Sequence, residues 1–194
     1  MVSVRLLAVA FAAPLFAALT PQQIVDSLQV LTTKSQALQA PAQSITIING
    51  PLIVIGLGPF PQIITGFGDI VSTATTAAAA LPGTAQITTD ADATAVADAF
   101  REFVRVHQVL LNILIGKAGL FQTVPVIGAP VAAALPQVEA IVDTVAFAIA
   151  DLVDPTTQKQ RLYTDRSSLK GTLTITVNSY DGLSLSKVKR EFRA

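Results

Sequence analysis

Residues 95–116, AVADAFREFVRVHQVLLNILIG, contain the pattern around which the rest of the chain is organised. Apolar side chains recur in it at intervals of three and four residues, which places them on one face of a helix. The opposite face carries Arg101, Arg105 and Gln108, so the pattern predicts an amphipathic helix with one side in water. Such a helix needs apolar partners from the rest of the chain. Its apolar face consists of Val96, Phe100, Phe103, His107, Leu110 and Leu114.

The composition of the whole chain supplies those partners. Of 194 residues, 51% are hydrophobic and 13% are charged, with a net charge of zero. This length predicts one domain with a sizeable core. The chain has no cysteine, which excludes disulfides, thiolate metal sites and cysteine nucleophiles.

Both ends of the chain differ from the middle. Residues 1–18 combine Arg5, an apolar run and small residues before a polar stretch, a pattern typical of a secretory signal peptide and too short for a membrane span. A simple N-terminal helix is the alternative. Residues 181–194 are predicted to be a basic C-terminal tail. The sequence therefore predicts a secreted protein, extracellular or in a cell wall, with its domain over residues 19–180.

Residues that begin and end helices along the domain predict an all-α bundle of about five helices. Thr20-Pro21-Gln22-Gln23 has the form of a capping box, with Pro41 limiting the helix that follows it. Lys117–Ile127 is a short apolar run before the next helix. The predicted helices cover residues 21–40, 61–80, 95–116, Pro130 or Pro136 to Leu152, and 156–180.

One apolar segment fits neither a helix nor a strand. Residues 45–64, ITIINGPLIVIGLGPFPQII, are interrupted by glycine or proline every few positions. So apolar a segment is rarely left exposed unless it contacts something; the alternative is a buried connector. The residues predicted to meet an apolar surface are Ile53, Val54, Ile55, Leu57 and Phe60.

Catalytic motifs are missing from the sequence. There is one histidine, and there is no GxSxG, HExxH or phosphate-binding glycine loop. Asp90 and Asp92 are interpreted as acids at a helix N-terminus rather than metal ligands. We therefore expect no enzyme activity, no cofactor, no metal and no nucleic-acid partner. His107 is interpreted as a hydrogen-bonded core residue, with a polar handle for a carboxylate as the alternative.

A transmembrane span over residues 124–150 is not expected. Pro125, Pro130 and Pro136 interrupt that apolar run, and Glu139 and Asp143 add charges to it.

Two consecutive segments resemble a known family. DAFREFVRVHQVLLNILIGKAGLF (98–121) and TVPVIGAPVAAALPQVEAIVDTVAFAIADLV (123–153) are similar to the fungal hydrophobic surface-binding protein A family, which includes cell-wall galactomannoprotein antigens. The resemblance implies a small secreted, non-enzymatic protein that adsorbs to hydrophobic surfaces and can recruit hydrolases to them. It also implies a helical bundle that holds fatty acids in an apolar interior. The family generally ends near the equivalent of Tyr180, so the basic tail departs from it.

Periodicity and resemblance together predict a tunnel between the helices that accepts a fatty-acid chain. Each predicted lining residue has ordinary core packing as its alternative. For the whole chain the alternatives are a surface-active coat and a structural cell-wall mannoprotein antigen without a specific ligand. The predicted lining is Phe67, Val71, Phe100, Phe103, Val104, His107, Leu111, Val145 and Ile149.

Overall fold

The computed structural model describes residues 18–46, 48, 52, 57–122 and 125–180, without the side chains of residues 121–130. Over these residues the chain is an all-α bundle, as predicted. The predicted signal peptide up to residue 17 and the predicted tail lie outside the described residues. The helices are α1 (Pro21–Ala37), α2 (Gln39–Gln43), α3 (Phe60–Ala80), α4 (Asp90–Gln122), α5 (Pro125–Leu152) and α6 (Thr156–Tyr180).

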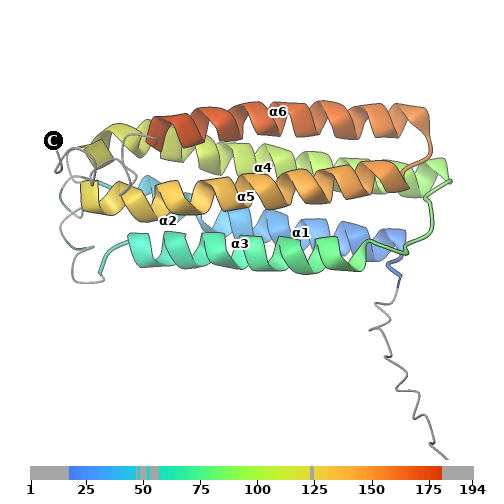
Figure 1. Ribbon diagram of the computed structural model, residues 1–194, viewed down its shortest axis with the longest axis horizontal. Helices are drawn as coiled ribbons and strands as arrows, with labels where there is room; N and C mark the ends of the chain where they lie inside the picture. Colours follow the sequence, from blue (N-terminus) through green and yellow to red (C-terminus); the bar gives the residue numbers. More distant parts are fainter. Residues whose placement is uncertain (1–17, 47, 49–51, 53–56, 123–124, 181–194) are drawn as a thin grey trace, which may run out of the picture.

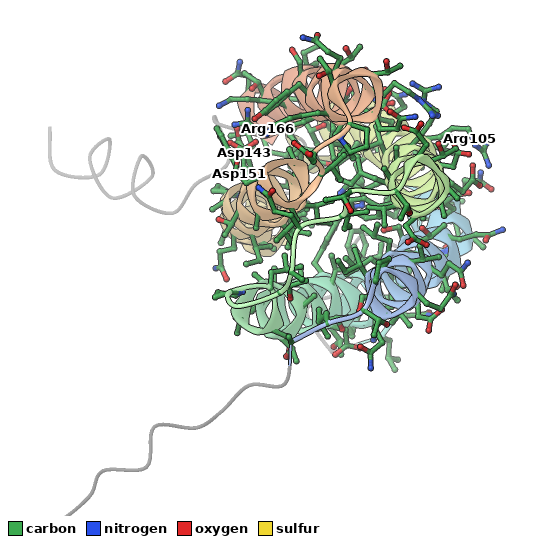
Figure 2. The ribbon with its side chains drawn as sticks, turned by 90° about the vertical axis from the view of Figure 1, so that its right-hand side faces the viewer. Arg105, Asp143, Asp151 and Arg166 are labelled. Carbon is green, nitrogen blue, oxygen red and sulfur yellow. The ribbon has the colours of Figure 1, made fainter. Side chains whose placement is uncertain are left out.

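The five long helices form a ring around one core (Figure 1). Helix α1 packs on α4, α4 on α6, α6 on α5 and α5 on α3, and the ring closes through a smaller contact between α3 and α1. Seen end-on, α1 and α3 lie side by side at the bottom and α6 lies at the top (Figure 2). The contact between α1 and α3 is the smallest of the five contacts in the ring.

Helix α1 begins with the predicted capping box. The Thr20 hydroxyl oxygen accepts a hydrogen bond from the Gln23 backbone N–H at 3.2 Å, and the Gln23 side-chain oxygen accepts one from the Thr20 N–H at 2.8 Å. These bonds satisfy N–H groups that have no partner within the helix. Pro41 lies inside the first turn of α2, where a missing N–H is tolerated.

The boundary between α4 and α5 differs from the prediction. Helix α4 continues to Gln122 and α5 begins at Pro125, so most of the expected short run 117–127 belongs to the ends of these two helices. Pro125 suits a first helical position, whereas Pro130 and Pro136 lie inside α5 despite the cost of proline there. Packing offsets that cost, because Val131, Leu135 and Val138 of α5 are fully buried.

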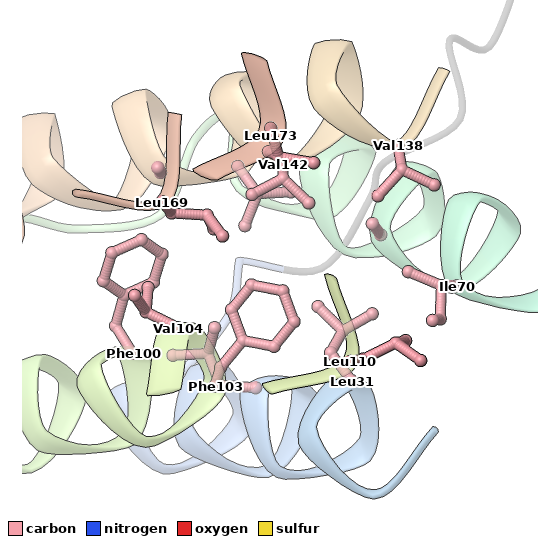
Figure 3. Close-up of a cluster of buried hydrophobic side chains, with 14 of the residues drawn as sticks. Leu31, Ile70, Phe100, Phe103, Val104, Leu110, Val138, Val142, Leu169 and Leu173 are labelled. Atoms are coloured by element: carbon pink, nitrogen blue, oxygen red, sulfur yellow. The ribbon is translucent and has the colours of Figure 1, made fainter. Parts of the chain in front are cut away.

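The apolar face predicted for residues 95–116 is the centre of the core. All six of its side chains are at most 2% exposed. Figure 3 shows Phe100, Phe103 and Val104 of α4 facing apolar residues from the other long helices. The labelled partners are Leu31 of α1, Ile70 of α3, Val138 and Val142 of α5, and Leu169 and Leu173 of α6.

Three helical segments are long and apolar enough to cross a membrane, judged by length and composition alone. They are Phe60–Ala80, Asp90–Leu120 and Val131–Leu152. The absence of a transmembrane span thus stays a prediction.

Candidate apolar ligand site

The structure gathers the predicted lining residues in one core. Eight of the nine are at most 4% exposed, and Val71 is partly buried against the same cluster. They come from α3, α4 and α5. Burial does not distinguish a ligand lining from ordinary core, so their role as ligand contacts stays a prediction.

A small apolar cavity lies in the described part of the bundle interior. Its volume is about 10 Å³, close to the minimum for a single water molecule. It lies between α1, α3 and α5, and of the predicted lining it touches Val145 and Ile149. Its complete lining is Leu19, Ile24, Ser27, Leu28, Leu31, Ala77, Leu81, Val145 and Ile149.

His107 provides the polar chemistry of the core. Its Nδ1 lies 2.9 Å from the Ser35 hydroxyl oxygen, and its ring packs on Phe103 with centroids 5.4 Å apart. Burial lowers the pKa of His107 to about 4, because the cation would lose its hydration, so the imidazole is neutral at neutral pH. The core prediction for His107 is confirmed in its burial and its hydrogen bond.

The second ring nitrogen of His107 has no partner among the described residues. This Nε2 atom is buried without a hydrogen bond, which is costly and calls for an explanation. If the Ser35 hydroxyl donates to Nδ1, Nε2 carries the proton and can donate; in the other tautomer Nε2 accepts. Either way the core presents one polar atom to an otherwise apolar neighbourhood.

In the sequence, Ser35 only interrupts the apolar face that Ile24, Leu28, Leu31 and Leu38 form. The structure shows that Ser35 is fully buried and bonded to His107. A hydroxyl at a core position of one helix and a histidine at a core position of another were the two signals available. Their pairing across 72 positions is set by the packing of α1 on α4.

The Gly/Pro-broken segment is only partly described. Leu57 is 56% exposed, in keeping with the predicted surface role, and its N–H donates to the Leu52 carbonyl at 2.9 Å. Phe60 corrects the prediction, since it begins α3 and is 1% exposed: its ring belongs to the core. Ile53, Val54 and Ile55 lie outside the described residues. Two further apolar side chains, Ile48 and Leu52, are 90% and 39% exposed.

Two grooves, which were not predicted from the sequence, lie on the outer face where α1 meets α3. One has a volume of about 410 Å³ and contains Lys34, Leu38 and Gly66. We call the other, of about 380 Å³, the entry groove. Its lining is Leu19, Ser27, Val30, Ser72, Thr73, Thr76, Ala77 and Ala80. Both grooves and the interior cavity thus lie along the α1–α3 contact.

Two hydrogen bonds hold the core together at the end of the bundle where α6 ends. The Tyr180 hydroxyl donates to the Leu114 carbonyl at 2.9 Å, and burial raises the pKa of Tyr180 above its ordinary value. Lys117 Nζ donates to the Ile45 carbonyl at 2.8 Å. In the part of the chain that the structure describes, no three or more histidine, cysteine or acidic side chains form a group that could hold a metal.

The fold is shared with two solved structures. The crystal structure of Afmp4p in complex with palmitic acid has a TM-score of 0.73 at 16% identity, and the match covers 83% of this chain and 99% of that chain. Ligand-binding domain 1 of the Penicillium marneffei MP1 protein, complexed with arachidonic acids, has a TM-score of 0.70 at 12% identity, with the same two coverages. At these low sequence identities, the structural similarity shows a shared fold alone. No protein-family profile and no curated protein sequence matches the chain.

Proposed function

We propose that this chain is a non-enzymatic protein that binds a fatty-acid-like ligand inside its helical bundle. The observation that carries the proposal is the fold shared with two proteins solved with fatty acids, over nearly the full length of both. The apolar core with a single unpaired histidine nitrogen supports it. This is the chemistry expected of a site for a long apolar chain with one polar head.

The acyl chain lies, in this proposal, between α1, α3, α4 and α5. Each buried CH₂ contributes about 0.8 kcal/mol before the costs of binding. A cavity of about 10 Å³ is far smaller than such a chain, so binding requires the helices to move apart. The proposed lining is the predicted set from Phe67 to Ile149, with the cavity residues of α1 added.

His107 is the proposed partner of the head group. A neutral imidazole with a free Nε2 can bond one oxygen of a carboxyl group, which satisfies a nitrogen that is otherwise buried without a partner. The Ser35 hydroxyl holds the ring through Nδ1. Ser35 and His107 then act together on one ligand atom.

The cellular setting is proposed from the sequence. The signal-like residues 1–18 and the family resemblance support secretion to the cell exterior or cell wall. Adsorption to apolar solids and recruitment of a secreted hydrolase are further proposals, supported by the resemblance and by the exposed Ile48, Leu52 and Leu57. A structural mannoprotein antigen without a ligand is the competing function.

Titration separates these functions. A fluorescent polyene fatty acid saturates an interior site at a fixed ratio close to one per chain. The amount of protein adsorbed to hydrophobic beads instead increases with the bead area. Replacing Leu52 and Leu57 by glutamate is expected to weaken adsorption to beads and to leave the fatty-acid ratio unchanged. Failure to bind the fatty acid at any concentration would overturn the proposed function.

A further inference from the structure

We propose that the ligand enters the bundle between α1 and α3, through the entry groove, and that Leu19 is the gate. This inference rests on the proposed function and adds a route and a controlling residue to it. It begins from the position of the cavity and both grooves along one helix–helix contact.

Three of the other four contacts around the ring carry polar bonds. Arg101 of α4 pairs with Asp165 of α6 at 3.0 Å, and Arg166 of α6 pairs with Asp143 of α5 at 3.0 Å; Figure 2 shows the second pair. Between α1 and α4 the buried Ser35–His107 bond adds to an extensive apolar contact. Each of these contacts would lose polar bonds if a ligand passed through it.

The contact between α1 and α3 lacks such bonds. Among the described side chains, none of α1 forms a hydrogen bond or ion pair with residues 61–80 of α3, and the two helices share the lightest packing in the ring. Separating them exposes apolar surface but breaks no polar pair there. Helices α3 and α5 share no polar bond among the described side chains either, but they pack more extensively than α1 and α3. The α1–α3 face therefore opens at the lowest cost.

A thin partition divides the entry groove from the cavity. Leu19, Ser27 and Ala77 line both spaces, so they form the wall between a groove of about 380 Å³ outside and the apolar cavity inside. Ser27 and Ala77 are small side chains fixed in helices α1 and α3. Leu19 is the one large side chain of the three.

Leu19 is also the easiest of the three to displace. It precedes the N-cap residue Thr20 and so belongs to no helix, and its side chain is only partly buried. One hydrogen bond, from its backbone nitrogen to the Thr84 hydroxyl oxygen at 3.0 Å, joins it to the segment after α3. With the predicted signal peptide 1–18 removed, that nitrogen is the amino terminus of the secreted chain. An outward movement of the Leu19 backbone breaks that bond without unwinding a helix. It carries the Leu19 side chain out of the wall and so connects the groove to the cavity.

The other end of the α1–α3 contact is closed by direct packing. A Cβ atom at Gly66 would lie 2.3 Å from Leu38 Cδ2, so the Leu38 side chain rests on the bare backbone of α3. We place the fixed end of the opening movement here. The second groove, which contains Leu38 and Gly66, is the competing entrance.

Stopped-flow binding of a fluorescent polyene fatty acid to the full secreted chain tests the gate. Leu19→Ala is expected to raise the association and dissociation rate constants severalfold by the same factor, with little change in Kd. Thr84→Val, which removes the acceptor of the Leu19 N–H, is expected to act in the same direction without making a hole. Val109→Ala is the control, since Val109 is 39% exposed on α4, outside both grooves.

A removable crosslink tests the competing entrance. Leu38 Cγ is 3.0 Å from the Cβ position of Gly66, which puts the two Cβ atoms of Leu38→Cys/Gly66→Cys within about 4.5 Å, a span suited to a disulfide. The proposal predicts equal rates in the oxidised and reduced forms of this variant. Slower exchange on oxidation, or unchanged rates in both Leu19→Ala and Thr84→Val, would overturn the gate. Loss of all equilibrium binding in the unmodified chain would instead overturn the proposed function.

Discussion

The Ser35 hydroxyl of α1 and the His107 imidazole of α4 form the polar pair inside the core, with 2.9 Å between Oγ and Nδ1. Both residues are fully buried. The pair links two helices that already pack extensively, and it leaves Nε2 as the atom available to a ligand. Stability, pH dependence and ligand choice should therefore all respond to these two residues.

The pH dependence of stability follows from the lowered pKa of His107. The folded value is about 4, against an ordinary value of 6.5, so between these pH values the unfolded chain binds the proton and the folded chain does not. Stability is then fully present above about pH 6.5 and is lost as the pH falls toward 4, by roughly 3 kcal/mol in all. Urea unfolding across this range should show that loss in the unmodified protein. His107→Gln, which cannot titrate, should lack it, and an equal slope in both proteins would contradict the assignment.

The Ser35–His107 bond can be measured by a double-mutant cycle. Ser35→Ala leaves Nδ1 buried without a partner and is expected to cost about 1–3 kcal/mol of unfolding free energy. Replacing both residues, as Ser35→Ala/His107→Leu, removes both polar groups and should cost less than the sum of the single changes. Additive costs in chemical denaturation would show that the two side chains do not interact.

Ligand choice depends on Nε2. His107→Leu is expected to weaken fatty-acid binding about tenfold, the loss of one hydrogen bond of about 1.4 kcal/mol. Binding of an alkane of the same chain length should stay the same or improve, because it has no head group to bond. Calorimetric titrations with both compounds check this. A parallel loss for acid and alkane would mean that His107 acts through packing alone.

Two glycines of α3 give a matched test of its packing. Gly68 has open space around its missing Cβ, whereas the Cβ position of Gly66 lies 2.3 Å from Leu38 Cδ2. Gly68→Ala should stabilise the protein by about 0.5–1 kcal/mol, since alanine favours a helix. Gly66→Ala should lose that gain and destabilise by about 1 kcal/mol, because Leu38 must move. Thermal unfolding compares the two, and equal stabilisation would place Leu38 away from α3.

Much of the fold was predictable because its signals are local. The spacing of apolar residues over 95–116 and the capping residues Thr20 and Gln23 specify helices without reference to the rest of the chain. The junction of α4 and α5 was missed because Pro130 and Pro136 suit the first turn of a helix, which placed the start of α5 too late. There the burial of α5 in the core outweighs the local preference.

The site was only partly predictable, because it depends on contacts between segments that are distant in the sequence. Apolar periodicity identifies residues such as Phe100 and Ile149 as buried, but it cannot separate a ligand lining from close-packed core. Phe60 was placed at the surface because its flanking prolines suggested a broken segment, and the structure buries it. The α1–α3 grooves and the Ser35–His107 pair arise between distant segments, so only the packed structure reveals them.

Native mass spectrometry can detect a fatty-acid-like ligand held inside the bundle. The protein, secreted by its host and purified without detergent, is compared with a denatured sample of itself. If the interior holds the ligand, the native spectrum shows one discrete added mass in the range of a fatty acid, and this mass is lost on denaturation. A bare chain in both spectra, which also stays bare after incubation with excess fatty acid, would show that the interior holds no such ligand.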